Sequence, residues 1–276
     1  MAEVTAADVK ALREQTGLPM MECKRALQET GGDPKAAVEW LRKQGIKTKE
    51  TRIGRETTAG RIAVYADVAE GVGAMIEIKC ESAPVAGSAE FKTFANDLAR
   101  QLAKGPGAKT ADELWKQPSP SKPGQTLGDV RDDMFNRIRE VFNLGRLVRI
   151  SAPCGGYAHH DGTSGALVEV SGGTTEVAKD IAMHVVAQKP QAVSKEELDP
   201  AAVDKEREIL SEAARREGKP ENIIGKMIEG RLKNFFAEKV LVEQPFVKDE
   251  KQTVGQLAKA AGMKVVRFVR WELGKE

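Results

Sequence analysis

One residue pattern occurs twice in this chain and constrains its fold more than any other feature. A Tyr-Ala pair is followed, at the same spacing in both copies, by Gly, Ala, aliphatic residues and one Glu. The copies are Tyr65-Ala66 with Gly73-Ala74-Met75-Ile76-Glu77-Ile78, and Tyr157-Ala158 with Gly165-Ala166-Leu167-Val168-Glu169-Val170. Each copy indicates a strand, a turn and a second strand, and an amphipathic helix follows at 97–102 and at 180–185. The repeat therefore predicts an α+β fold with two related subdomains that contain antiparallel sheets.

The remaining core elements are placed around this repeat. A proline-rich loop and a helix through Met134, Ile138 and Val141 separate the copies, and a strand at 146–152 is expected to lead into the second copy. Two apolar stripes at helical spacing, joined by a turn at Gly218-Lys219-Pro220, predict a helical hairpin inserted at about 195–236. A helix at 254–261 and a strand at 265–273 close the chain.

The first 46 residues predict a separate bundle of three short helices. Thr5 and Asp8 form a capping-box pattern before the first helix, which continues to Gly17. A second helix runs from Pro19 or Met20 to about Gln28, and Asp33-Pro34 starts a third that stops at Gly45. We expect this module at 1–46, a solvated linker at 47–60, one core subdomain at 61–148 and a second at 149–276.

Composition excludes several functional classes. The 276 residues include 43 Lys and Arg against 41 Asp and Glu, a net charge of only +2 that argues against a dedicated nucleic-acid binder. No apolar run approaches the roughly 18 residues of a membrane span, and the N-terminus has no signal-peptide pattern. Three widely spaced cysteines without a Cys-x-x-Cys motif indicate a reduced, cytoplasmic protein with no disulfide frame.

Residues that could carry covalent chemistry are few. There is neither a phosphate-binding loop nor a dinucleotide fingerprint, so a nucleotide enzyme is not expected. Cys154 with His159 and His160 is the one group that resembles a nucleophile–base pair or a metal site. Neighbouring histidines on a strand point to opposite faces, which disfavours shared metal ligation. We interpret these residues as surface or turn positions, and we expect no cofactor and no metal.

Four residues of the N-terminal module have two interpretations. Lys10 and Arg13 lie one turn apart on one helix face, which is typical of a solvated surface. Met20 and Met21 are adjacent, so they cannot both face the core, and at least one should be partly exposed. An exposed methionine at a helix start suits an adaptable protein-binding surface. Spacing alone favours core packing for the methionines and leaves the binding interpretation open.

A wider set of motifs identifies a family. The chain resembles bacterial elongation factor Ts, whose N-terminal module is similar to ubiquitin-associated (UBA) three-helix domains. The resemblance covers nearly the whole chain in order, and the residues that carry it are Leu12-Arg13-Glu14, Thr16-Gly17, Met20-Met21, Cys23-Lys24, Ala26-Leu27, Gly32-Asp33, Ile181-Ala182-Met183-His184-Val185, Gln188-Lys189-Pro190, Gly218-Lys219-Pro220, Lys226-Met227-Ile228-Glu229-Gly230-Arg231, Gln244-Pro245-Phe246-Val247 and Thr253-Val254-Gly255-Gln256-Leu257.

This resemblance implies a function without covalent chemistry. Members of the family bind elongation factor Tu in its GDP-bound and nucleotide-free forms and speed the release of GDP, so that GTP can reload. By position, Lys10, Arg13, Met20 and Met21 correspond to contacts with the GTPase domain, and His159 corresponds to a further partner contact. The resemblance therefore favours the binding interpretation of the two methionines. It implies no direct contact with nucleic acid or membrane.

The sequence departs from the family in one functional segment. The family has Thr-Asp-Phe-Val after the second strand, where the Phe acts as a wedge in elongation factor Tu and helps to displace Mg²⁺. Here the corresponding residues are Ser82, Ala83, Pro84 and Val85. A proline cannot fill an aromatic slot, so the wedge is expected to be weaker, differently placed or matched by a changed partner. The alternative function is therefore a chaperone-like module that binds elongation factor Tu with weakened exchange.

Overall fold

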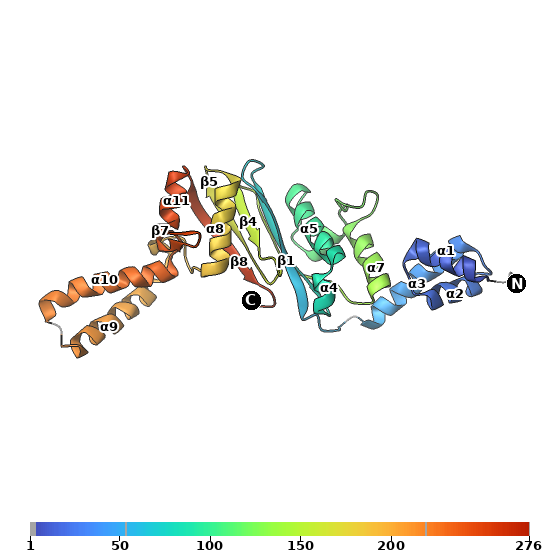
Figure 1. The fold of residues 1–276 in the computed structure, drawn as a ribbon, viewed down its shortest axis with the longest axis horizontal. Coiled ribbons are helices and arrows are strands. Elements are labelled where there is room, and N and C mark those ends of the chain that lie inside the picture. The colour runs from blue at the N-terminus through green and yellow to red at the C-terminus, as the bar shows by residue number, and fades with distance from the viewer. Residues whose placement is uncertain (1–3, 53, 219, 276) are drawn as a thin grey trace. The chain divides into compact units, whose positions relative to one another are not determined.

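The computed structural model describes residues 4–52, 54–218 and 220–275. These residues form a mixed α+β fold with eleven α-helices and small β-sheets, which confirms the expected fold class at that level (Figure 1). The chain divides into two compact units, one of residues 1–61 with 76–147 and the other of residues 62–75 with 148–276. Among the helices described, none is both long enough and apolar enough for a membrane crossing.

Three helices that pack on one another open the first unit: α1 (Ala6–Thr16), α2 (Met20–Glu29) and α3 (Pro34–Arg52). The predicted capping box is present, because Asp8 N–H donates to Thr5 Oγ1 at 3.2 Å and Thr5 N–H donates to Asp8 Oδ2 at 3.0 Å. Gly17 ends α1 at a φ of 68°, a conformation that glycine adopts without steric cost. The helices share a small core of Val9, Leu12, Leu18, Cys23, Ala26, Leu27, Ala37 and Leu41.

The third helix does not stop at Gly45, as expected, but continues to Arg52. The first six residues of the expected linker, 47–52, are therefore part of this helix. Gly45 is buried where α3 meets α7 (Leu127–Ile138), and a Cβ at this position would lie 1.9 Å from Asn136 Oδ1. The glycine thus permits close packing of two helices. A single glycine inside a helix costs only about 1 kcal/mol relative to alanine, so it need not end one.

The first sheet contains β1 (Ala59–Asp67), β2 (Val72–Cys80) and β3 (Asn143–Ile150), in that order. Between β2 and β3 the chain forms α4 (Ala83–Gly87), α5 (Ala89–Lys104), α6 (Ala111–Trp115) and α7. The helix α5 buries a continuous apolar face that includes Phe91, Phe94, Leu98 and Leu102. Its N-terminus is capped by Ser88, whose Oγ accepts from Phe91 N–H at 3.2 Å.

The second sheet has the same order of elements. It contains β4 (Cys154–Ala158), β5 (Ser164–Ser171) and β8 (Lys264–Glu272), with both neighbouring pairs antiparallel. In both sheets a hairpin is followed by helices and then by a third strand beside the second strand. The strand expected at 146–152, before the second copy, is present as β3 and spans 143–150. It pairs with β2 in the first sheet, and this pairing depends on long-range contacts that local pattern does not reveal.

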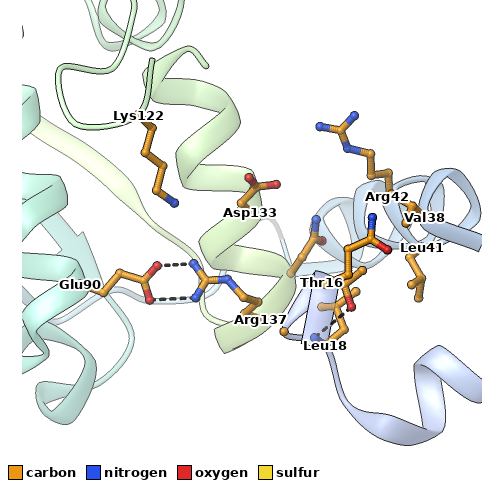
Figure 2. Close-up of a pocket in the computed structure, with 12 residues that line it drawn as sticks. Thr16, Leu18, Val38, Leu41, Arg42, Glu90, Lys122, Asp133 and Arg137 are labelled. Carbon is orange, nitrogen blue, oxygen red and sulfur yellow. Dashed lines mark hydrogen bonds and ion pairs between the residues drawn. The ribbon is translucent and has the colours of Figure 1, made fainter. Parts of the chain in front are cut away.

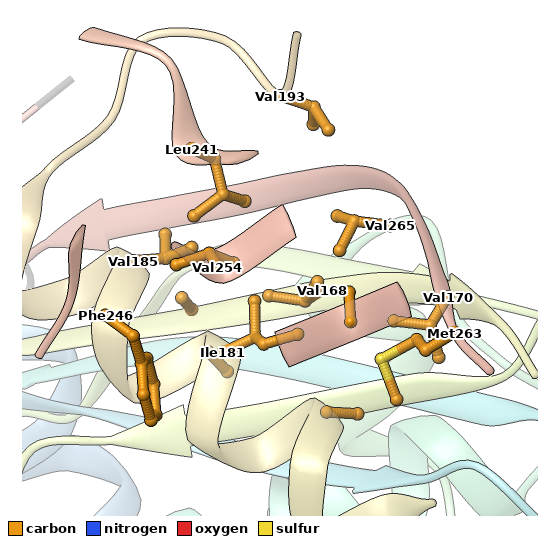
Figure 3. Packing of buried hydrophobic residues seen from close by; sticks show 14 of the residues in the cluster. Val168, Val170, Ile181, Val185, Val193, Leu241, Phe246, Val254, Met263 and Val265 are labelled. Atoms are coloured by element: carbon orange, nitrogen blue, oxygen red, sulfur yellow. The ribbon is translucent and has the colours of Figure 1, made fainter. Parts of the chain in front are cut away.

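The helix α8 (Thr175–Gln188) covers β4 and β5 and supplies much of the second unit's core. Figure 3 shows Ile181 and Val185 of this helix packed with Val168 and Val170 of β5 and with residues from the C-terminal part of the chain. The C-terminal part comprises η2 (Leu241–Glu243), β6 (Pro245–Phe246), β7 (Asp249–Thr253), α11 (Val254–Ala260) and β8.

A pair of helices, α9 (Pro200–Arg216) and α10 (Glu221–Lys239), follows the short helix η1 (Lys195–Glu197). The two helices lie side by side (Figure 1) and bury Ala214, Ile224, Ile228 and Leu232 between them. Arg231 also donates to both carboxylate oxygens of Glu217, at 3.0 and 2.9 Å. The predicted helices on either side of the turn are therefore present.

Candidate partner-binding site

The two methionines at the start of α2 are both exposed. Met20 is 47% exposed and Met21 is 72% exposed, whereas Cys23 and Leu27 on the same helix are fully buried. The spacing argument required only one exposed methionine, so the structure goes further than that expectation. A flexible thioether side chain can adapt its shape to a partner, so this pair forms a surface suited to protein binding.

The two basic residues of α1 also lie on the surface. Lys10 pairs with Glu14 at 3.9 Å, but both side chains are about 70% exposed, so the pair contributes little to stability. Arg13 is exposed, and its backbone carbonyl accepts the N–H of Gly17 at the end of the helix. Both side chains are therefore available to an acidic partner surface without loss of a buried contact.

The segment 82–85 begins the short helix α4. Ser82 occupies the N-cap position with extended backbone, and Ala83 and Pro84 are exposed. Proline is tolerated in the first turn of a helix because its missing N–H has no helical partner there. Ser82 N–H and Oγ both donate to Glu140, at 3.0 and 2.5 Å. The segment thus presents a small apolar surface at the start of α4.

His159 lies in the turn between β4 and β5. Its Nδ1 is 3.0 Å from Asp161 Oδ1, and its ring meets Tyr157 edge to face at 6.4 Å. Burial raises the pKa of Asp161, but hydrogen bonds from Thr163 and His159 outweigh this effect and hold the pKa at about 2. These residues line a pocket of about 520 Å³ that also includes Met183 and Val247. The histidine is therefore held in place beside a partly apolar hollow.

The group considered for covalent chemistry is not assembled as a nucleophile site. Cys154 is fully buried, and burial, followed by the charge of Glu169, raises the pKa of its thiol to about 12. A reactive cysteine needs the opposite shift. The argument from strand alternation was wrong for His159 and His160, because β4 ends at Ala158 and their rings lie only 4.3 Å apart. Even so, no group of three or more His, Cys, Asp or Glu that could hold a metal ion occurs among the described residues.

His184 is a buried residue in the core of the second unit. Its Nε2 lies 2.9 Å from Gln244 Oε1, and its Nδ1 accepts the N–H of Val247 at 3.2 Å. Burial lowers the pKa of His184, an effect that the hydrogen bond to Gln244 partly opposes. The histidine therefore links α8 to the residues on either side of β6.

Sequence reasoning missed a pocket of about 620 Å³ in the first unit. Figure 2 shows that its lining combines Thr16, Leu18 and Arg42 of the N-terminal segment with Glu90 of α5, Arg137 of α7 and Lys122 of the loop that precedes α7. Arg137 and Glu90 pair with each other through two hydrogen bonds. No local motif predicts such a pocket, because its walls come from segments far apart in the sequence.

The predicted contacts fall in both units. Lys10, Arg13, Met20, Met21 and the segment 82–85 belong to the first unit, and His159 belongs to the second.

Comparison with known proteins gives a consistent result. The family model described as "Elongation factor TS" matches residues 81–275. The chain is 44% identical over 274 residues to "Elongation factor Ts" of Methylococcus capsulatus, covering 99% of this chain and 92% of that protein. It is 38% identical over 284 residues to the protein of the same name from Aquifex aeolicus, covering 98% of each chain. For the Renibacterium salmoninarum protein the identity is 40% over 284 residues, covering 99% of this chain and 100% of that one. The chain therefore belongs to the elongation factor Ts family.

Proposed function

We propose that this chain is a guanine-nucleotide exchange factor for elongation factor Tu. It binds the GDP-bound form, promotes the release of GDP and Mg²⁺, and leaves the nucleotide-free form ready for GTP. The observation that carries this proposal is family membership over nearly the whole chain. It is a binding reaction in the cytoplasm, with no covalent step and no cofactor of the chain's own.

The physical basis of exchange is thermodynamic linkage. A protein that binds the nucleotide-free GTPase more tightly than the GDP form must weaken GDP binding by the same factor. Typical coupling free energies of about 1–3 kcal/mol correspond to roughly 5- to 150-fold changes in affinity. We place the coupling of this exchange factor at or above the upper end of that range.

In this proposal the exposed residues of the N-terminal helices bind the GTPase domain. Met20 and Met21 supply apolar area, while Lys10 and Arg13 supply positive charge. His159 is a further contact, and its position beside Tyr157 and Met183 supports this role. The segment Ser82–Val85, here called the exchange segment, is the part of the chain that disturbs the Mg²⁺ site of the partner.

The same proposal extends to the architecture. We assign residues 1–46 as a UBA-like module, 47–60 as the connection, and 61–148 and 149–276 as the two core subdomains. The helical pair within 195–236 is assigned as a coiled-coil insertion. The packing of α1, α2 and α3 and the apolar seam between α9 and α10 support these assignments.

Release of a fluorescent GDP analogue from the cognate elongation factor Tu tests this function. We expect the release rate to rise with the concentration of the chain and to reach a plateau. A rate that stays at its intrinsic value at every concentration would contradict the proposal. The variant Cys154→Ala is a useful control, because a covalent role of this thiol requires that it lose activity, whereas exchange by binding does not.

Pro84 favours a second candidate function, in which the chain binds elongation factor Tu but exchanges nucleotide weakly. Its exposed ring at the start of α4 is smaller than the aromatic side chain of the family. In this case the chain associates tightly with the partner while the release rate barely changes. The double variant Ala83→Asp/Pro84→Phe should then raise the plateau rate, and an unchanged plateau would count against this candidate.

A further inference from the structure

The end of α7 continues into a segment, 137–141, that contacts several parts of the first unit. Arg139 has a left-handed backbone (φ 65°) and pairs with Glu22 on α2. The next residue, Glu140, contacts Ser82 at the start of the exchange segment. Two neighbouring side chains therefore serve two different elements, and they can be tested separately.

Glu140 binds both polar hydrogens of Ser82. Ser82 N–H donates to Glu140 Oε2 at 3.0 Å, and Ser82 Oγ donates to Glu140 Oε1 at 2.5 Å. Hydrogen bonds to a carboxylate are stronger than those between neutral groups. A serine at an N-cap normally uses its hydroxyl to accept an N–H of the first helical turn. Ser82 makes no such bond, so its hydroxyl serves Glu140 instead of capping α4.

A second contact of the same kind runs in the opposite direction. Val141 N–H donates to Glu81 Oε1 at 2.9 Å. Each of the two segments thus contributes a carboxylate that accepts a backbone N–H of the other. Because β2 and β3 are neighbours in the sheet, this reciprocal pair extends their connection past the last residue of β2.

The carbonyl of Ser82 is fixed as well. It accepts a hydrogen bond from the Cys80 thiol, with Sγ at 3.3 Å, and another from the Ala86 N–H at 3.1 Å. Burial, followed by the charge of Glu140, raises the pKa of this thiol to about 11, so it stays protonated and can donate. Every polar group of Ser82 therefore has a partner, although the two residues after it are exposed.

We propose that Glu140 is a positioning residue for nucleotide exchange, which holds Ser82 so that Ala83 and Pro84 face the partner in a fixed orientation. This inference rests on the proposed function of the exchange segment. Glu140 acts through Ser82 and does not itself touch the partner. A rigid presentation matters most where a small proline replaces a large ring, because a mobile small side chain exerts little steric force.

The variant Glu140→Ala tests this proposal in the GDP-release assay. We expect the plateau rate to fall about tenfold, while the concentration giving half the plateau changes less than about twofold, because partner contacts remain but positioning is lost. Glu140→Gln and Ser82→Ala each keep one hydrogen bond and should give intermediate rates. The double variant Ser82→Ala/Glu140→Ala should be no slower than Glu140→Ala alone, because both changes remove the same contact.

Arg139→Ala is the matched control. It changes the neighbouring residue, keeps a non-glycine side chain at the left-handed position and leaves the Ser82 contacts in place. Its plateau rate should equal that of the unaltered chain. A plateau that falls equally in Arg139→Ala and Glu140→Ala would overturn the proposal, as would an unaltered plateau in Glu140→Ala.

Amide hydrogen exchange supplies a readout that needs no partner. The Ser82 N–H should exchange much faster in Glu140→Ala, while buried amides of α5 such as that of Leu98 keep their protection. Loss of protection across the whole first unit would indicate a purely structural role and contradict the proposal. If the unaltered chain failed to speed GDP release from elongation factor Tu, the proposed function would fail. The exchange rate of the Ser82 N–H would still show whether Glu140 fixes the segment.

Discussion

Single residues on α2 divide sharply into those that fold the chain and those available to a partner. Met21 is 72% exposed, whereas Leu27, less than two turns further along, is fully buried. Removing an exposed side chain leaves no cavity, whereas truncating a buried one loses both apolar transfer energy and packing. Binding and stability should therefore respond to different substitutions on the same helix.

Met21→Ala should weaken partner binding without unfolding the chain. We expect the concentration needed for half-maximal GDP release to rise about tenfold, as for a central interface residue, with a thermal unfolding midpoint close to that of the unaltered chain. Leu27→Ala is the control, and its free energy of unfolding should fall by about 2–5 kcal/mol. An unchanged half-maximal concentration in Met21→Ala would show that this side chain is not part of the interface.

His184 should make the stability of the second unit depend on pH. Its pKa in the folded chain lies below the ordinary value of 6.5 because it is buried, an effect that the hydrogen bond to Gln244 only partly opposes. The unfolded chain therefore binds a proton first as the pH falls. The contribution of unprotonated His184 to the free energy of unfolding is fully present above pH 6.5. It is lost as the pH falls below that value toward the pKa of the folded chain.

Denaturant unfolding at a series of pH values measures this effect. The difference in unfolding free energy between the unaltered chain and His184→Asn should be constant above about pH 7.5 and shrink as the pH falls toward 5. Parallel pH profiles for the two proteins would show that His184 does not titrate differently in the folded and unfolded states.

At the scale of elements, local chemistry predicts where most helices begin. Thr5 with Asp8 forms a capping box, and Pro34 occupies the first position of α3, as expected from their sequence patterns. The end of α3 could not be predicted in the same way, because Gly45 is required by the approach of Asn136, which lies far along the chain. The pairing of β3 with β2 could not be predicted either, because it also joins segments that lie far apart in the sequence.

The candidate site residues were predictable only in part. Resemblance to the elongation factor Ts family suggests Met20, Met21 and His159 as partner contacts, whereas spacing alone left core packing and binding both open for the two methionines. Glu140 was not predicted at all, since it lies 58 residues from Ser82 and carries no motif. Contacts of this range depend on the assembled sheet and helices.

The extension of α3 to Arg52 can be tested by one substitution. Thr48→Pro removes a backbone donor and clashes with the preceding turn, which costs about 3 kcal/mol or more inside a helix. We expect a loss of helical circular dichroism and faster amide exchange from Gly45 onward. Thr48→Ala is the control and should retain both signals. If Thr48→Pro behaves like Thr48→Ala, the segment 46–52 does not contribute a stable helix in solution.

At the scale of the whole molecule, exchange requires no reactive group but does require a difference in affinity. The proposed function requires that the chain bind elongation factor Tu more tightly without GDP than with it. If so, GDP and the chain each weaken the binding of the other, and linkage makes the two factors equal. In this proposal the candidate partner contacts, the exchange segment and its support by Glu140 all act through this single difference in affinity.

The most direct test is therefore a pair of equilibrium titrations. One measures the Kd of the chain for elongation factor Tu with and without saturating GDP, and the other measures the Kd of GDP with and without the chain. The account predicts that both Kd values rise by the same factor, at or above about 150-fold. Equal affinities in the presence and absence of the second ligand would contradict it.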